Sequence, residues 1–408
     1  LFFAWLIGCV AYATVDLATL DTLPVNYVTL LVGSAAVLLI GHVVIRRLAP
    51  HADPVLYPVA AMINLLGLVM IHRLDIADQL RAQANDNKSP SSDAVAQATW
   101  VLVALVLFTL VLFFVTDHRK LQRYTFTFLV VGVVLLLLPL LPIIGTTING
   151  ARLWIRLGPL SFQPSELAKI ALTIFFAGYL VRKREALATV RRKILGLGIP
   201  RGRDFGPLVV AWLVALSILA FQRDLGTALM FFGVFVILLY VATQRRSWLI
   251  IGAVLFALAA VLGYLAFGHV QLRVKIWLDP WTYANDEGYQ LVQALFGLAS
   301  GGLFGTGLGE GYPQFIPFAK TDFISAALGE ELGLAGMLAL LMLFAILVER
   351  GLRTGLACRD PFGTLLAVGL SSVFALQVFV TVGGVTRLIP LTGLTTPFLS
   401  YGGSALVI

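Results

Sequence analysis

The residues with the clearest potential for chemistry follow a glycine-rich segment, where Lys320, Thr321 and Asp322 precede a long apolar run. Two further acids, Glu330 and Glu331, lie inside that run. Acids are costly to keep at membrane depth, so an acid in such a run is by default a candidate for a functional site. A carboxylate can act as a general base that takes the proton of an attacking hydroxyl group. We therefore predict that Asp322 is catalytic.

The same residues also have structural interpretations. Asp322 or Thr321 could cap the following helix, and Lys320 could extend its ammonium group from a membrane interface into water. Glu330 lies eight residues beyond Asp322, about 12 Å along a helix and about 80° around it, which is too deep for an acid–base partner. We expect at least one of Glu330 and Glu331 to make hydrogen bonds between helices.

The composition is that of a membrane protein. Of the 408 residues, 59% are hydrophobic and 12% are charged, and the mean hydropathy is +0.93, whereas a soluble domain carries roughly 25% charged residues. Apolar runs such as Val101–Val115 and Phe128–Leu141 do not alternate as the strands of a membrane barrel do. We predict an all-α, polytopic membrane protein with about 12 transmembrane helices and a large extracytoplasmic loop.

The orientation follows from the positions of Lys and Arg. The predicted spans cover approximately residues 1–18, 27–46, 54–72, 97–116, 124–144, 165–182, 206–221, 226–243, 247–267, 323–348, 362–384 and 392–408. Basic residues concentrate in the segments that are internal if the N-terminus is cytoplasmic, above all in residues 182–203. The positive-inside rule then predicts that both termini are cytoplasmic. The loop 268–321 and Asp322 would face outside the cytoplasmic membrane.

Three other features exclude function classes. The net charge of +8 follows this topology, so it does not indicate a nucleic-acid partner. Cys9 and Cys358 lie far apart, which argues against a disulfide or a zinc site, and no metal site is predicted. Residues 1–18 lack a basic start and a clear cleavage site, so we interpret them as a membrane span and not as a signal peptide.

The predicted outside segments differ in character. Arg73–Ala96 is polar and is interpreted as a flexible loop. The loop 268–321 is rich in aromatic residues and is expected to fold onto the outer membrane face, with an amphipathic helix at Tyr289–Ala299. Its glycines do not follow a nucleotide-binding order, so we expect them to allow sharp turns or close helix approach.

One candidate substrate-binding cluster combines Arg152, Trp154 and Arg156 with Glu166 and Lys169. Glu166 and Lys169 are three residues apart, so on a helix they share a face and can form an ion pair. This pair could hold helices together or line a cavity for a polar substrate. Trp154 could equally be an aromatic residue of the membrane interface.

Further candidates lie nearer the C-terminus. Asp224 could cap the next helix or pair with a basic residue in a cavity. Arg273 and Lys275 could meet lipid phosphates or one pyrophosphate. The segment 387–404 is interrupted by Pro and Gly, a pattern tolerated at membrane depth only inside protein or beside a cavity, so it is either a packed, kinked helix or a substrate lining.

At these residues the chain resembles the SEDS family, whose members are of the RodA and FtsW types. The resemblance runs from about residue 54 to the end and rests on five motifs in order, namely Phe162–Lys169 (FQPSELAK), Gln222–Thr227 (QRDLGT), Gly288–Gln293 (GYQLVQ), Thr321–Phe323 (TDF) with Glu330–Gly333 (EELG), and Pro397–Ser404 (PFLSYGGS). Residues 1–53 would then supply two extra N-terminal helices before the core of residues 54–408. Lys320, where the family often has His, and Arg223, where it has Pro, depart from the pattern.

The resemblance implies a peptidoglycan glycosyltransferase that polymerises lipid II into a lipid-linked glycan strand outside the cytoplasmic membrane, with a class B penicillin-binding protein as partner. It places the essential acid at Asp322, the motif tryptophan at Trp154 and a further motif acid at Glu166. A role in cell elongation is favoured over one in division. The cofactor stays unassigned, with a divalent cation as a candidate.

A mechanism follows as a hypothesis. Asp322 would take the proton of the acceptor hydroxyl group, and the acceptor would displace a polyprenyl pyrophosphate with inversion. The charge of that leaving group would be met by residues among Arg152, Arg156, Arg273, Lys275 and Lys320, while Glu166, Lys169 and Asp224 shape the cavity. The alternatives are a flippase for lipid-linked precursors and a scaffold that only recruits its partner.

Overall fold

The computed structural model describes residues 1–24, 27–85, 92–142, 144–148, 151–157, 160–188, 192–194, 197–199 and 202–406. The chain divides into two compact units, each built from separate stretches. Of the described residues, the first unit comprises 1–116, 273–350 and 377–406, and the second comprises 117–272 and 351–376. Segments that are distant in the sequence are therefore neighbours within each unit.

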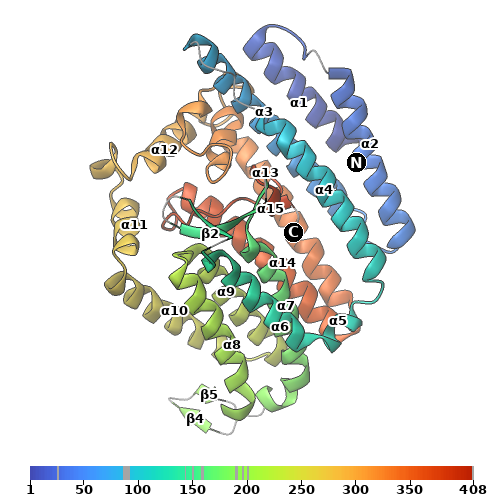
Figure 1. The fold of residues 1–408 in the computed structure, drawn as a ribbon, viewed down its shortest axis with the longest axis vertical. Coiled ribbons are helices and arrows are strands. Elements are labelled where there is room, and N and C mark those ends of the chain that lie inside the picture. Colours follow the sequence, from blue (N-terminus) through green and yellow to red (C-terminus); the bar gives the residue numbers. More distant parts are fainter. Residues whose placement is uncertain are drawn as a thin grey trace. The chain divides into compact units, whose positions relative to one another are not determined.

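The first unit begins with four long helices, α1 (Phe2–Leu20), α2 (Tyr27–Leu48), α3 (Leu56–Ala84) and α4 (Asp93–Phe114). They run side by side, blue to cyan in Figure 1. Tyr12 of α1 stacks on His72 of α3 with ring centroids 4.0 Å apart, and His72 Nε2 lies 2.6 Å from Asp16 Oδ1. These contacts hold α1 firmly against α3.

The rest of the first unit follows the long loop. Its elements are most of α11 (Gly268–Leu278), the short 3₁₀ helices η2 (Trp281–Tyr283) and η3 (Pro313–Phe315), α12 (Tyr289–Gly301), most of α13 (Ile324–Ala357) and α15 (Gly403–Leu406). The predicted amphipathic helix is confirmed as α12, which buries Leu291, Val292 and Ala294. Its Phe296 is exposed and lies beside Trp281.

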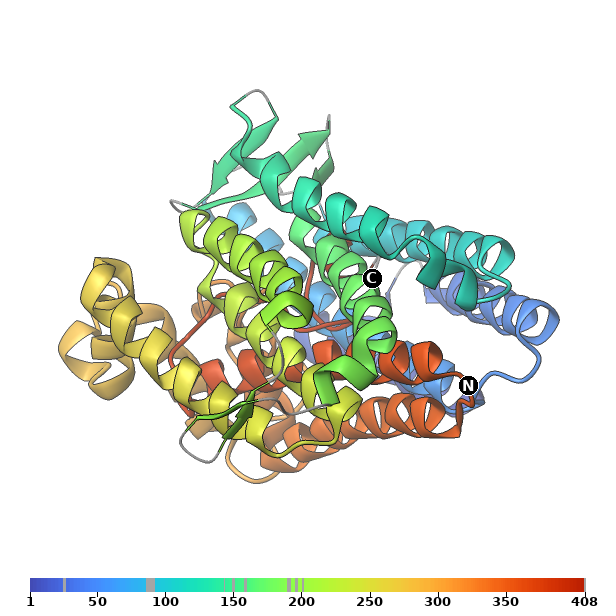
Figure 2. The ribbon, with the colours of Figure 1, turned by 90° about the horizontal axis from the view of Figure 1, so that it is seen from below.

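The second unit is organised around α7. Its elements are α5 (Arg119–Arg123), α6 (Thr125–Leu137), η1 (Leu138–Leu140), β1 (Gly145–Ile148), β2 (Ala151–Leu157), β3 (Leu160–Phe162), α7 (Pro164–Ala188), β4 (Arg192–Ile194), β5 (Leu197–Ile199), α8 (Gly202–Phe221), α9 (Leu225–Thr243), α10 (Ser247–Ala266) and part of α14 (Pro361–Val385). Helix α7 buries Leu172, Phe175, Phe176 and Leu180 against α6 and α9. Figure 2 shows the ribbon from below.

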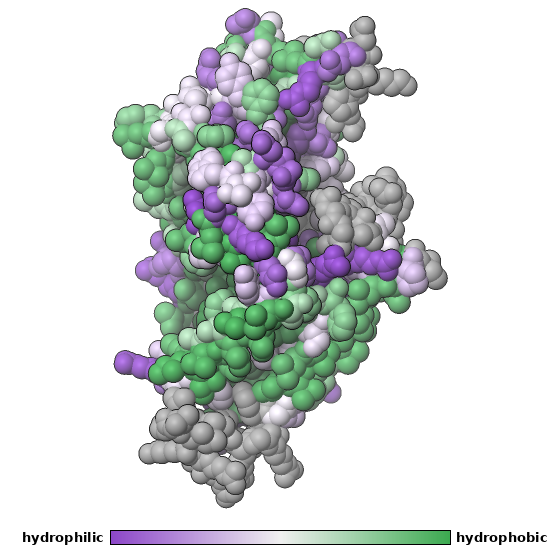
Figure 3. Space-filling model, turned by 90° about the vertical axis from the view of Figure 1, so that its left-hand side faces the viewer, coloured by the Kyte–Doolittle hydropathy of each residue, from purple (hydrophilic) through white to green (hydrophobic). Residues whose placement is uncertain are grey.

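The predicted fold class is confirmed. Among the described residues, nine helices are long and apolar enough to cross a membrane, and two shorter apolar helices cover 125–140 and 206–221. Helix α10 exposes an apolar face of Ile250, Val254, Leu258 and Leu262, and large hydrophobic surfaces of this kind are green in Figure 3. Such a face suits contact with lipid.

Two sequence-based boundaries were wrong. The segment 73–96 is not a loop throughout, because α3 continues to Ala84 and α4 begins at Asp93, each extending the helix beyond its apolar part. The predicted last span, 392–408, has non-helical backbone up to Gly402, and the described helix there is α15. Its Pro and Gly residues, with positive φ at Gly393 and Gly402, account for the irregular backbone.

Helix α13 is broken at Gly333, whose φ of 66° and ψ of −169° are not helical. A break of this kind leaves backbone carbonyls without their helical partners. The carbonyls of Glu330 and Glu331 instead accept the N–H groups of Thr306 and Gly307, at 3.0 Å each. The glycine-rich loop, residues 301–311, thus replaces the missing helical hydrogen bonds on one side of the break.

The same loop also supplies hydrogen-bond partners on the C-terminal side of the break. Leu334 N and Ala335 N donate to the carbonyls of Gly302 and Leu303, at 3.0 Å each. The approach requires glycine at position 305, because its φ is 85° and an added Cβ would collide with the carbonyl of Glu331. This confirms the interpretation of the glycines as sites of sharp turns and close approach.

Gly305→Ala is therefore expected to destabilise the protein by about 1–3 kcal/mol, the usual cost of a strained backbone conformation, with the collision adding to it. The melting temperature of the purified protein in detergent measures the effect. Gly263→Ala in α10 is the matched control, since nothing lies within 4 Å of its added Cβ. Equal melting temperatures for the two variants would contradict the expectation.

Candidate active site

Asp322 lies in the turn that leads into α13 and is partly buried. The turn is closed by Thr321 N and Phe323 N, which both donate to the carbonyl of Phe318, at 3.0 and 3.2 Å. The side chain of Phe323 is fully buried and anchors the turn. An added Cβ at Gly393 would lie 3.7 Å from Asp322 Oδ2, so the backbone of the segment 386–402 passes beside the carboxylate.

Burial raises the pKa of Asp322 to about 6, although a hydrogen bond with Thr321 and the charge of Arg273 oppose the shift. A carboxylate with a pKa near the working pH is both largely ionised and basic enough to accept a proton. The environment of Asp322 therefore suits general-base chemistry.

The segment 386–402 is held in place by side chains of the first unit. Arg273 Nη1 donates to the carbonyls of Leu391 and Thr392, at 3.3 and 3.2 Å. Ser400 Oγ donates to the carbonyl of Thr321 at 2.7 Å. Gln97 Nε2 donates to the carbonyl of Ser400 at 3.2 Å. These bonds fix the irregular segment beside the turn of Asp322.

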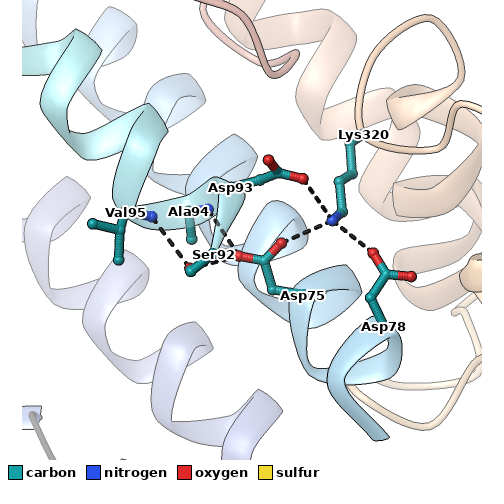
Figure 4. Close-up of polar contacts among 7 residues, drawn as sticks. All are labelled: Asp75, Asp78, Ser92, Asp93, Ala94, Val95 and Lys320. Carbon is teal, nitrogen blue, oxygen red and sulfur yellow. Dashed lines mark hydrogen bonds and ion pairs between the residues drawn. The ribbon is translucent and has the colours of Figure 1, made fainter. Parts of the chain in front are cut away.

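Lys320, next to the same turn, is surrounded by acids (Figure 4). Its Nζ lies 2.8 Å from Asp75 Oδ1, 2.7 Å from Asp78 Oδ2 and 2.8 Å from Asp93 Oδ2. Burial alone would lower the pKa of Lys320, but the hydrogen bonds to the three carboxylates outweigh it and raise the pKa above its usual value. The ammonium group is therefore charged and already bound by carboxylates.

Glu330 and Glu331 have the structural role expected of them. Arg73 Nε of α3 donates to Glu331 Oε1 at 3.1 Å, and Arg73 Nη2 donates to the carbonyl of Gly311 at 2.8 Å. Glu330 Oε1 accepts the N–H of Tyr312 at 2.7 Å. These side chains hold the glycine-rich loop against α13 and α3.

The second unit contains six of the other predicted site residues. Lys169 Nζ lies 2.6 Å from Glu166 Oε2 on α7, and both side chains are buried, which confirms the predicted ion pair. Asp224 Oδ1 accepts the N–H of Thr227 at 2.9 Å, so Asp224 caps α9 as one of the two interpretations expected.

Arg152, Trp154 and Arg156 lie on β2, a strand that was not predicted from the sequence. Arg152 and Trp154 share one face of β2, since side chains alternate along a strand, and Ile155 on the other face is buried. Trp154 pairs with Thr146 of β1, and Arg156 pairs with Ser161 of β3. The side chain of Arg156 lies outside the described part of the structure.

In the first unit, Lys275 is exposed on α11. The acids around Lys320 were not predicted from the sequence. The signal for Asp75 and Asp78 was their spacing of three residues, which places both on one helix face, but their segment was interpreted as a loop. Among the described residues, no group of three or more His, Cys, Asp or Glu side chains is arranged to hold a metal ion.

The fold and the site define a polytopic helical membrane protein with a carboxylate, suited to act as a base, at the entry to a broken helix. A family model described as cell cycle protein, of the FtsW, RodA and SpoVE type, matches residues 54–408. The chain therefore belongs to the FtsW/RodA/SpoVE family.

Several relatives are similar over most of their length. The peptidoglycan glycosyltransferase RodA of Mycobacterium tuberculosis H37Rv is 51% identical over 90% of this chain and 77% of its own. Stage V sporulation protein E of Bacillus subtilis is 33% identical over 87% of this chain and 93% of its own.

Two solved structures also match. One, described as a peptidoglycan synthase complex that coordinates polymerization and crosslinking, has a chain that aligns with a TM-score of 0.64 and 29% identity, over 88% of this chain and 94% of that one. A variant of the rod shape determining protein RodA of Thermus thermophilus aligns with a TM-score of 0.59 and 28% identity, over 88% of this chain and 93% of that one.

Proposed function

We propose that this protein is a peptidoglycan glycosyltransferase that polymerises lipid II at the outer face of the cytoplasmic membrane, for cell elongation and shape. The observation that carries the proposal is the partly buried carboxylate of Asp322, held in a fixed turn beside the segment 386–402. The 51% identity to proteins named peptidoglycan glycosyltransferase RodA supports the reaction class and favours the elongation role.

In the proposed reaction, Asp322 is the general base. The oxygen of the acceptor hydroxyl group attacks the anomeric carbon of the lipid-linked donor while its proton passes to the Asp322 carboxylate. A glycosidic C–O bond forms, the bond from the anomeric carbon to the pyrophosphate breaks, and polyprenyl pyrophosphate leaves. One carboxylate acting as base fits an inverting displacement without a covalent intermediate.

The substrate would be bound by basic and aromatic side chains. Arg152, Arg156, Arg273 and Lys275 are the proposed contacts of the pyrophosphate, with Trp154 against the substrate, and a divalent cation is a further candidate for the same charge. Glu166, Lys169 and Asp224 would shape the cavity. Lys320, predicted from the sequence as a further phosphate contact, is left out of this set because three carboxylates already surround its ammonium group.

The setting of the enzyme is part of the proposal. The positive-inside rule supports cytoplasmic termini and an outward-facing Asp322. A class B penicillin-binding protein is the proposed partner, and the similarity to a chain of a peptidoglycan synthase complex supports a partner of this kind.

Purified protein with lipid II, with and without the partner, tests the function. We expect glycan polymer from the wild-type protein, separated by gel electrophoresis. The same preparation in liposomes tests the flippase alternative. Movement of labelled lipid II across the bilayer without any polymer would overturn the proposal.

The pH profile of the reaction should fall on its acidic side with an apparent pKa of about 6, because Asp322 must be deprotonated to act as base. The pKa of this group is raised from 3.8 to about 6 in the folded protein, so the stability it contributes is complete below 3.8 and is lost as the pH rises through about 6. Acid inactivation through Asp322 should therefore be reversible and occur without unfolding. Rates from pH 5 to 8, with near-ultraviolet circular dichroism at each pH, measure both effects.

A further inference from the structure

We propose that Lys320 is a positioning residue, whose ammonium group, held by Asp75, Asp78 and Asp93, fixes the turn that presents Asp322. This rests on the proposed function of Asp322 as the base. The three acids come from two helices, Asp75 and Asp78 from α3 and Asp93 from the first residue of α4. Lys320 thereby ties the turn to both helices at once.

The carboxylate of Asp75, which binds Lys320, is itself held in place. Asp75 Oδ1 binds Lys320, while its Oδ2 accepts hydrogen bonds from Ser92 Oγ at 2.7 Å and Ala94 N at 2.8 Å (Figure 4). Both oxygens of Asp75 are therefore occupied, and its side chain is only 4% exposed. Asp75 thus joins α3, the start of α4 and Lys320 in one network whose central residue, Asp75, is buried.

The backbone of Lys320 is also held. Tyr401 N donates to the carbonyl of Lys320 at 2.8 Å, and Ser400 Oγ donates to the carbonyl of Thr321. The two peptide groups before Asp322 are thus fixed from the segment 386–402, and the side chain of Lys320 is fixed from α3 and α4. Asp322 follows directly, so any shift of Lys320 is transmitted through two peptide bonds to the carboxylate.

The charges favour positioning over substrate binding. Three carboxylates around one ammonium group leave a net charge of −2, which repels a pyrophosphate. An ammonium group that donates to three acceptors has used all of its donors. Lys320 therefore acts on the reaction through the placement of Asp322.

Lys320→Met removes the ammonium group and keeps the length of the side chain. Since a displacement of about 1 Å can lower a rate about 100-fold, we expect kcat for lipid II polymerisation to fall by that order at an unchanged KM. The fall of the rate on the acidic side of the pH profile, near pH 6, should remain, because Asp322 is still the base. Lys320→Arg, which keeps a cation with several donors, should recover most of the activity even if Lys320→Met folds poorly.

Asp75 and Asp78 should differ in how far kcat falls when each is replaced. In Asp75→Asn, whichever way the amide is turned, its NH₂ faces either Lys320 Nζ or the donors Ser92 and Ala94. The side chain of Asp78 is 40% exposed and contacts Lys320, so water can replace this contact when it is lost. We expect a larger loss of kcat in Asp75→Asn than in Asp78→Asn.

Lys120→Met is the control, since Lys120 is an exposed lysine of α5 outside the proposed machinery, and it should retain wild-type kcat. Full kcat in Lys320→Met would overturn the inference, and so would a loss expressed as a higher KM, which indicates substrate binding. If the wild-type protein makes no polymer, the proposed function fails. If Asp322→Asn is inactive while Lys320→Met is normal, only the present inference fails.

Discussion

Asp322→Asn is expected to reduce lipid II polymerisation by about 10²–10⁴-fold, the usual contribution of a general base. The amide is nearly the same size as the carboxylate, so the turn and the contact with Gly393 are retained while the proton acceptor is lost. The rate of polymer formation by purified protein measures the effect, and the acidic limb near pH 6 should vanish together with the activity.

The control for this variant is Asp286→Asn. Asp286 is an exposed acid of the loop 268–321, which precedes Asp322. Its replacement changes the net charge by the same amount, so the rate of this variant should stay at the wild-type level. Near-normal polymer from Asp322→Asn, at an unchanged melting temperature, would remove Asp322 from the mechanism. If the protein were only a scaffold that recruits its partner, the third interpretation of the sequence, this substitution would also have no effect on its function.

Arg73→Met is expected to destabilise the protein by about 3–5 kcal/mol, because it leaves a buried carboxylate without its partner. The side chains of Arg73 and Glu331 are 6% and 0% exposed, so water cannot replace the lost contact. The carbonyl of Gly311 loses its donor as well. The melting temperature in detergent reports the loss.

Two further variants make this result specific. Arg73→Met combined with Glu331→Gln should regain part of the stability, since the amide oxygen of Gln can still accept the N–H of Gly309 and the unpaired carboxylate at position 331 is no longer present. Arg350→Met is the control, because Arg350 lies 3.6 Å from Asp53 in a more exposed pair, which typically contributes about 0–1 kcal/mol. Similar losses in Arg73→Met and Arg350→Met would contradict the role of the buried pair.

Local chemistry could be predicted from the sequence where it depends on short spacing. The ion pair of Glu166 and Lys169 follows from helical periodicity, and the cap at Asp224 follows from its place before α9. The membrane class and most helices follow from the apolar runs. Asp322 could be singled out because an acid at the entry to an apolar run has few structural explanations.

Contacts between distant segments could not be predicted in this way. The acids that bind Lys320 lie 227 to 245 residues away from it, and no local pattern indicates such a pairing. The strand β2 (Ala151–Leu157) was missed because it is short and lies in the connection between the predicted spans 124–144 and 165–182, where so few residues show no clear strand pattern. The break in α13 was missed because one Gly in an apolar run is compatible with a straight helix.

The repaired break in α13 has a consequence for the exchange of amide hydrogens with solvent. The amides of Thr306 and Gly307 lie in an irregular loop, but each donates to a carbonyl of α13, so they exchange only when the loop separates from the helix. We expect deuterium uptake there to be as slow as at Leu334 and Ala335, whose amides depend on the same loop. The glycine-rich loop and the two halves of α13 should open together, as one cooperative unit.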